Sequence, residues 1–175
     1  MKQASARGAR PGHGRGLTLF ELMITLAVLA LLATLTLPSF AGMAQRARLK
    51  SVAETLAADM TEARFEAAQR GQALHMAFKP GANWCWAVAT AAQCACEPMP
   101  AAACRLKAVR GADHGGIALL QSTTVRLEPS GEASASPDLA LFESPSGERL
   151  RVSVSPLGRA TICAPTAPVP GYRAC

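Results

Sequence analysis

The longest run of apolar residues lies near the N-terminus. Residues 17–37 are apolar apart from four threonines and one carboxylate, Glu21. As a helix, this segment would span about 30 Å, the hydrocarbon thickness of a bilayer. An ionised carboxylate in such a segment is costly unless a partner satisfies it, so the position of Glu21 requires a physical reason.

A helical pattern continues beyond Pro38. Apolar side chains recur at three- and four-residue spacing and predict a buried stripe made of Leu49, Val52, Leu56, Met60, Ala63 and Ala67. The charged residues lie largely off this stripe and are expected to face solvent: Arg48, Glu54, Asp59, Glu62, Glu66 and Arg70. Gly71 is a natural helix stop. The pattern therefore predicts one helix from about Thr18 to Arg70, bent near Pro38.

The chain after Gly71 shows the alternation of short strands. Large apolar residues alternate with polar or small ones over residues 74–78, 84–89, 124–128 and 150–155, and shorter candidates lie at 117–120 and 139–142. Proline and glycine mark turns between these segments, and residues 90–103 have the composition of an irregular loop. Several short antiparallel strands after one long helix predict an α+β fold.

The net charge is concentrated at the N-terminus. The chain carries a formal charge of +6, of which residues 1–16 contribute +4 through Lys2, Arg7, Arg10 and Arg15. The remaining +2 is too small to indicate a general polyanion-binding surface. A basic flank before an apolar run is typical of an N-terminus held on the cytoplasmic side of a membrane. The length of the chain leaves room for one globular domain.

All six cysteines lie at or beyond position 85, which predicts disulfides formed in an oxidising compartment. Cys163 and Cys175 are the expected pair in the C-terminal tail, because the proline-rich segment between them cannot be held by a strand ladder. Their disulfide would stabilise the fold by about 3 kcal/mol. The pairing of the other four is open: Cys85, Cys94, Cys96 and Cys104. A zinc site is the alternative, but no Cys-x-x-Cys spacing occurs.

Residues 16–21, Gly-Leu-Thr-Leu-Phe-Glu, resemble the prepilin signature of type IV pilins and type II secretion pseudopilins. In that family a basic leader is cut after a glycine, the new N-terminal residue is methylated, and the fifth mature residue is glutamate. The resemblance implies that prepilin peptidase cuts between Gly16 and Leu17, which makes Glu21 the fifth residue. Pro38 falls at the position of a helix-bending proline in the family. Leu17 is a departure, because phenylalanine or methionine is commoner there.

The proposed cut gives Glu21 a partner. Cleavage would leave a positive amine on Leu17, and in a filament the glutamate of one subunit is expected to meet the amine of its neighbour. Because an unpaired buried charge is costly, the two charges can be buried only when neighbouring subunits are aligned in the one axial register that pairs them. The resemblance thus implies that Glu21 and Pro38 act in filament assembly.

The end of the predicted helix resembles the GspH/FimT group of minor pilins and pseudopilins. The similar positions are Ala63-Arg64, Glu66-Ala67 and Arg70. DNA-uptake members of this group carry a C-terminal Gly-Arg-x-Arg element, of which Gly158-Arg159 is kept and the second arginine is lost. Arg173 could replace it if the tail folds back, and the adjacent Tyr172 could stack on a base. Two arginines imply only weak, salt-dependent binding of nucleic acid.

These observations predict four segments: a leader at 1–16, a transmembrane and filament-core helix at 17–38, its amphipathic continuation at 39–71, and a periplasmic antiparallel β domain at 72–175. The implied protein is a structural subunit that primes or tips a type II secretion pseudopilus or a type IV pilus. Its expected partners are other pilins or pseudopilins, prepilin peptidase and the inner-membrane assembly platform.

Two other functions remain open. One is a DNA-binding minor pilin for natural transformation, with Arg159 and Arg173 as contacts. The other is a secreted binding domain released by signal peptidase after Ala41, since Ser39 and Ala41 are the small residues that such a cut requires. An enzyme is not expected, because His75 is isolated and Asp113-His114 lies in a glycine-rich turn. No cofactor or metal ligand set is expected either.

Overall fold

The computed structural model describes residues 18–175 except 82, 95, 97–102 and 135–137, and it leaves out the side chains of residues 35–39. The predicted cleavage site, Gly16 and Leu17, lies outside the described residues. The chain divides into two compact units, Met1–Phe40 and Ala41–Cys175.

One helix, α1 (Leu19–Arg70), runs through both units. Thr18 caps its start, since the Glu21 N–H donates to Thr18 Oγ1 at 3.2 Å. The helix ends where Gly71 adopts a φ of 62° and the Gln72 N–H donates to the Ala67 carbonyl at 3.2 Å. Within the part of the chain that the structure describes, no helix combines the length and apolar composition that a membrane crossing needs.

The second unit contains two antiparallel sheets. The five-stranded sheet has the order β3-β2-β1-β5-β6 and the four-stranded sheet the order β4-β7-β8-β9. The strands are β1 (Leu74–Lys79), β2 (Cys85–Ala89), β3 (Arg105–Arg110), β4 (Ala118–Ser122), β5 (Val125–Leu127), β6 (Ala133–Ser134), β7 (Asp138–Glu143), β8 (Arg149–Val154) and β9 (Ala160–Cys163). A short 3-10 turn, η1 (Gly111–Asp113), follows β3. This confirms the predicted α+β fold.

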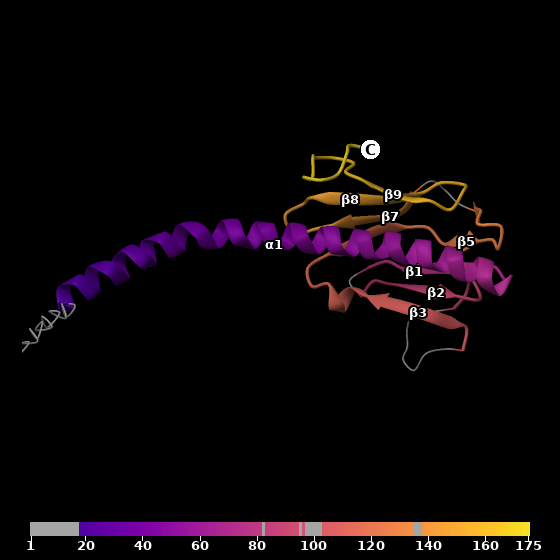
Figure 1. The fold of residues 1–175 in the computed structure, drawn as a ribbon, viewed down its shortest axis with the longest axis horizontal. Coiled ribbons are helices and arrows are strands. Elements are labelled where there is room, and N and C mark those ends of the chain that lie inside the picture. The colour runs from indigo at the N-terminus through magenta and orange to yellow at the C-terminus, as the bar shows by residue number, and fades with distance from the viewer. Residues whose placement is uncertain (1–17, 82, 95, 97–102, 135–137) are drawn as a thin grey trace, which may run out of the picture. The chain divides into compact units, whose positions relative to one another are not determined.

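One hydrophobic core joins α1 to both sheets. The predicted stripe from Leu49 to Ala67 is buried, together with the inward residues of the strands. Within the second unit, Figure 1 shows the later turns of α1 running along the sheets, with β7, β8 and β9 on one side of the helix and β1, β2 and β3 on the other. At the centre, the rings of Trp84 and Trp86 stack with centroids 5.5 Å apart, and Phe142 meets both edge-on.

Strand β2 is buried on both faces, although its alternation predicts only one buried face. Trp86 and Val88 face the main core, while Cys85 and Ala87 form a small second cluster with Cys96. Two disulfides, Cys85–Cys96 and Cys94–Cys104, connect this side of the sheet to the loop after β2. Cys96 therefore covers part of a sheet face that would otherwise be exposed.

Candidate functional site

The N-terminal unit presents an apolar helix surface that carries one carboxylate. All side chains described between residues 18 and 34 are exposed, including Leu19 at 78% and Phe20 at 72%. Among the described residues, the Glu21 carboxylate has no hydrogen-bond or ion-pair partner. Helix α1 continues through Pro38, whose side chain is not described. An exposed apolar surface of this kind is typical of one that packs against apolar neighbours.

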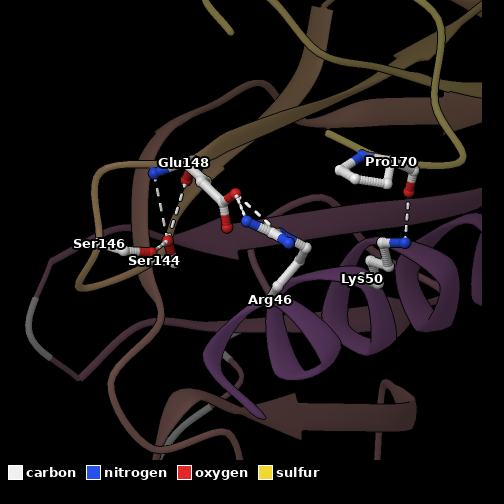
Figure 2. Close-up of polar contacts among 6 residues, drawn as sticks. All are labelled: Arg46, Lys50, Ser144, Ser146, Glu148 and Pro170. Atoms are coloured by element: carbon white, nitrogen blue, oxygen red, sulfur yellow. Dashed lines mark hydrogen bonds and ion pairs between the residues drawn. The ribbon is translucent and has the colours of Figure 1, made fainter. Parts of the chain in front are cut away.

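In the second unit, an ion pair joins α1 to the turn between β7 and β8. Arg46 Nη2 lies 2.6 Å from Glu148 Oε1, and Arg46 Nε donates to the same oxygen at 2.8 Å (Figure 2). The other oxygen, Oε2, is buried and has no partner among the described residues. The turn is held by Ser144, whose Oγ accepts from the Glu148 N–H at 3.2 Å. Hydrogen bonding to Glu148 raises the pKa of Arg46.

The C-terminal tail folds back onto α1. Cys163 and Cys175 form a disulfide, Lys50 Nζ donates to the Pro170 carbonyl (Figure 2), and the Tyr172 hydroxyl donates to Glu54. Burial, and then the hydrogen bond to Glu54, raise the pKa of Tyr172 to about 12. Tyr172 is half-buried against the helix and its hydroxyl is held by Glu54, while the suggestion that its ring stacks on a nucleic-acid base stays a prediction.

Asp59 is buried, and its predicted solvent-facing position is wrong. Its side chain is only 3% exposed, and each carboxylate oxygen has a partner. Trp86 Nε1 donates to Oδ2 at 2.8 Å, and Lys107 Nζ lies 2.8 Å from Oδ1 and 2.6 Å from Glu62 Oε2. The hydrogen bonds from Lys107 to Asp59 and then to Glu62 raise the pKa of Lys107. Trp86, whose indole N–H needs an acceptor, lies 27 residues after Asp59, so the pattern of the helix could not predict the contact between them.

The two candidate DNA-contacting arginines lie at opposite ends of β9. Arg159 is exposed in the turn before the strand, whereas the Arg173 carbonyl accepts from the Ala164 N–H just after it. At about 3.3 Å per residue, the two ends are roughly 16 Å apart. The structure therefore does not bring Arg159 and Arg173 into one site.

Arg64 lies beside Gly158 instead. A methyl group added at Gly158 would come within 3.1 Å of Arg64 Cδ, and one added at Gly131 within 2.9 Å of Arg64 Nε. The Arg64 side chain thus covers two turn glycines, and its guanidinium has no ion-pair partner among the described residues. The resemblance at Ala63-Arg64 was the only sequence signal for this position.

The six cysteines, His75 and His114 are in structural environments. All six cysteines are in disulfides, so none is free to act as a zinc-binding thiolate. The His114 ring stacks on Trp84 with centroids 6.0 Å apart. Burial, and then the charge of Arg126, lower the pKa of His75. Among the described residues, no cluster of histidine, cysteine and carboxylate side chains could hold a metal ion.

Two models of known protein families match this chain. The family model described as "Type II transport protein GspH" matches residues 52–158, more than half of the chain. The chain belongs to the GspH family. A second model, described as "Prokaryotic N-terminal methylation motif", matches residues 13–37. No curated protein and no solved structure gives a significant match.

Family membership makes the protein a GspH-type pseudopilin or minor pilin, a structural subunit whose partners are other pilins or pseudopilins and prepilin peptidase. The methylation motif, which includes Gly16, Leu17 and Glu21, implies assembly into a filament at the inner membrane. The GspH match ends at residue 158. It therefore includes Asp59 and Arg64, whereas the Cys163–Cys175 tail lies beyond the matched region.

Proposed function

We propose that the protein is a minor subunit that primes or tips a type II secretion pseudopilus or a type IV pilus. The observation that carries this proposal is the exposed apolar surface of residues 19–34, in which Glu21 has no partner among the described residues. Such a surface becomes stable only when it is covered, first by lipid and then by the same helix of neighbouring subunits.

The order of events follows from the N-terminal residues. The basic leader holds residues 1–16 in the cytoplasm, residues 17–38 anchor the chain, and residues 72–175 face the periplasm. Prepilin peptidase cuts after Gly16, and the new Leu17 amine is methylated. In the filament that amine pairs with Glu21 of an adjacent subunit, so that only one axial register leaves no buried charge unpaired. The inner-membrane assembly platform would extract the processed subunit.

Mass spectrometry of the mature N-terminus tests the processing step. The expected product begins with methylated Leu17. A chain that begins at Gly42 would instead establish a secreted domain released after Ala41, and the filament proposal would be wrong.

The role of Glu21 is tested by Glu21→Ala and by the isosteric Glu21→Gln. Both variants should insert and be processed, yet both should be lost from sheared filaments, because neither can pair with the Leu17 amine. Thr25→Ala, one turn further along α1, is the matched control and should assemble normally. Normal incorporation of Glu21→Gln would contradict the proposed register.

DNA capture is a second candidate function, favoured by one observation. Arg64 lies beside Gly158, the residue that precedes Arg159 in the turn, and the Arg64 guanidinium has no ion-pair partner among the described residues. The double variant Arg64→Ala with Arg159→Ala should abolish any gel shift of short duplex DNA by the full chain at low salt. Retention of the shift in this variant would contradict a DNA contact at this turn.

A further inference from the structure

The tail between the last two cysteines, residues 164–174, forms a strap that rests on α1. The Tyr172 hydroxyl donates to Glu54, and Lys50 Nζ reaches from the helix to donate to the Pro170 carbonyl (Figure 2). The same ammonium nitrogen lies 5.6 Å from the centre of the Tyr172 ring, within the range of a cation–π contact. The strap therefore covers the flank of α1 that carries Lys50 and Glu54.

The backbone hydrogen bonds described for the strap join it to itself rather than to the sheets. Ala164 and Ala174 form one isolated bridge, and the Tyr172 N–H donates to the Val169 carbonyl at 3.0 Å. Val169 anchors the strap in the main core. Ordering a segment of this length costs conformational entropy at every residue. The Cys163–Cys175 disulfide, which joins the two ends, is therefore the main restraint on the strap.

This disulfide is also more accessible than the other two. Cys175 is exposed and Cys163 is half-buried, and both line a hollow on the surface of the domain. Each of the other two disulfides, Cys85–Cys96 and Cys94–Cys104, has at least one cysteine that is 4% exposed or less. Because reduction requires a thiolate to reach a sulfur atom, an exposed disulfide is reduced before a buried one. A reductant can thus break the bond of the strap and leave the other two intact.

We propose that the Cys163–Cys175 disulfide is a redox-sensitive lock that keeps the strap closed on α1. The reductant is a protein dithiol. One of its thiolates attacks the Cys175 sulfur, the S–S bond breaks, and Cys163 leaves as a thiolate that is then protonated. The second thiol loses its proton, attacks the mixed disulfide and releases the Cys175 thiolate, which is protonated in turn. Two electrons and two protons pass to the strap, and the dithiol becomes a disulfide.

Reduction changes which surface of α1 is covered. Without the disulfide, one buried valine and a few polar contacts do not offset the entropy of ordering the strap. The strap then leaves the helix, and Lys50 and Glu54 lose their partners and face solvent. Oxidation restores the closed form. This lock acts on the second unit and is additional to the role of residues 19–34 in assembly.

The order in which the disulfides are reduced is the first test. The full chain in detergent micelles is titrated with dithiothreitol, free thiols are alkylated, and the modified peptides are identified by mass spectrometry. Cys163 and Cys175 should be alkylated at reductant concentrations that leave the other four cysteines bonded. Simultaneous reduction of all three disulfides, or earlier reduction of another pair, would overturn the proposal.

Hydrogen exchange then measures whether the strap opens. After selective reduction, the peptide that contains Tyr172 should exchange up to about a hundredfold faster, as expected when a cross-link over 12 residues is lost. The peptide that contains β8 should keep its protection, and oxidised glutathione should restore that of the strap. Unchanged exchange in the strap, or equal loss of protection in β8, would contradict a lock that acts on the strap alone.

Two variants separate the disulfide from the other contacts of the strap. Cys163→Ser with Cys175→Ser should exchange rapidly in the strap without any reductant. Tyr172→Phe is the matched control, because it removes the hydrogen bond to Glu54 and keeps the disulfide, and its strap should stay protected until it is reduced. If oxidised Tyr172→Phe lost as much protection as the double cysteine variant, the hydrogen bond would be the lock and the proposal would be wrong.

Discussion

Tyr172 reports directly on the position of the tail, because it is the only tyrosine in the chain. Burial and the hydrogen bond to Glu54 raise the pKa of Tyr172 to about 12, whereas the pKa of a tyrosine in an unfolded chain is about 10. Absorbance of the tyrosinate should therefore give a midpoint near 12 in the native protein and near 10 in denaturant. Because the folded state holds the proton more tightly, this group's stabilising contribution is complete below pH 10 and falls as the pH rises towards 12.

The same titration in Glu54→Gln is the control for the hydrogen bond. Its native midpoint should move towards the ordinary tyrosine value, since the carboxylate no longer disfavours the tyrosinate. A native midpoint near 10 in the unaltered protein would mean that the tail does not rest on α1.

Gly158 is required by its surroundings as well as by its backbone. Its φ is 69°, and an added methyl group would lie 2.6 Å from the Gly131 carbonyl oxygen. Gly147 has a similar φ of 81° but no atom within 4 Å of the added carbon. Gly158→Ala should therefore cost about 3 kcal/mol in urea unfolding, against about 1 kcal/mol for Gly147→Ala. Equal costs would show that only the backbone conformation matters at Gly158.

Residues with a local partner could be interpreted from the sequence, and those with a distant partner could not. The Cys163–Cys175 bond was expected because the segment between these residues has no other means of being held. Asp59 was misplaced because its partners, Trp86 and Lys107, lie on separate strands. The pairing of Cys94 with Cys104 depends on how β2 and β3 align, which no spacing rule contains.

At the scale of elements, Asp59 links α1 to both β2 and β3. Asp59→Ala should lower the free energy of unfolding by about 2 kcal/mol, because the buried Trp86 N–H loses its acceptor. Glu62→Ala is the control, since Glu62 pairs with the same lysine but is 65% exposed, and it should cost less than about 1 kcal/mol. Chemical denaturation of both variants measures the difference, and similar costs would locate the effect in Lys107 alone.

Helices and strands could be predicted from the sequence where apolar residues recur at a regular spacing along the chain. The second half of α1 and the strands β1, β5 and β8 have buried apolar residues at the period of their structure. Strand β3 was missed because it lies at a sheet edge and carries three charged residues in six positions. Strand β9 was missed because it is four residues long and only partly buried.

For the whole molecule, the disulfides should set the thermal stability of the second unit. Each closes a loop of 10–12 residues, and such a loop contributes about 3 kcal/mol in the chain-entropy account. A reducing agent should therefore lower the melting temperature strongly, and Cys163→Ser with Cys175→Ser should reproduce only the part due to the tail. Calorimetry with and without reductant measures both, and an unchanged melting temperature would mean that the core alone suffices.

The arrangement of the first four cysteines also bears on how the protein is made. Cys85 bonds to Cys96 and Cys94 bonds to Cys104, so the two loops interleave along the chain. Oxidation in the order of emergence would join each cysteine to the next free one and give Cys85–Cys94 and Cys96–Cys104. The native pairs therefore require that β2 and β3 align before the thiols react, or that an isomerase exchanges the bonds afterwards. A cell that produces this subunit must supply disulfide isomerisation as well as oxidation whenever export is faster than hairpin formation.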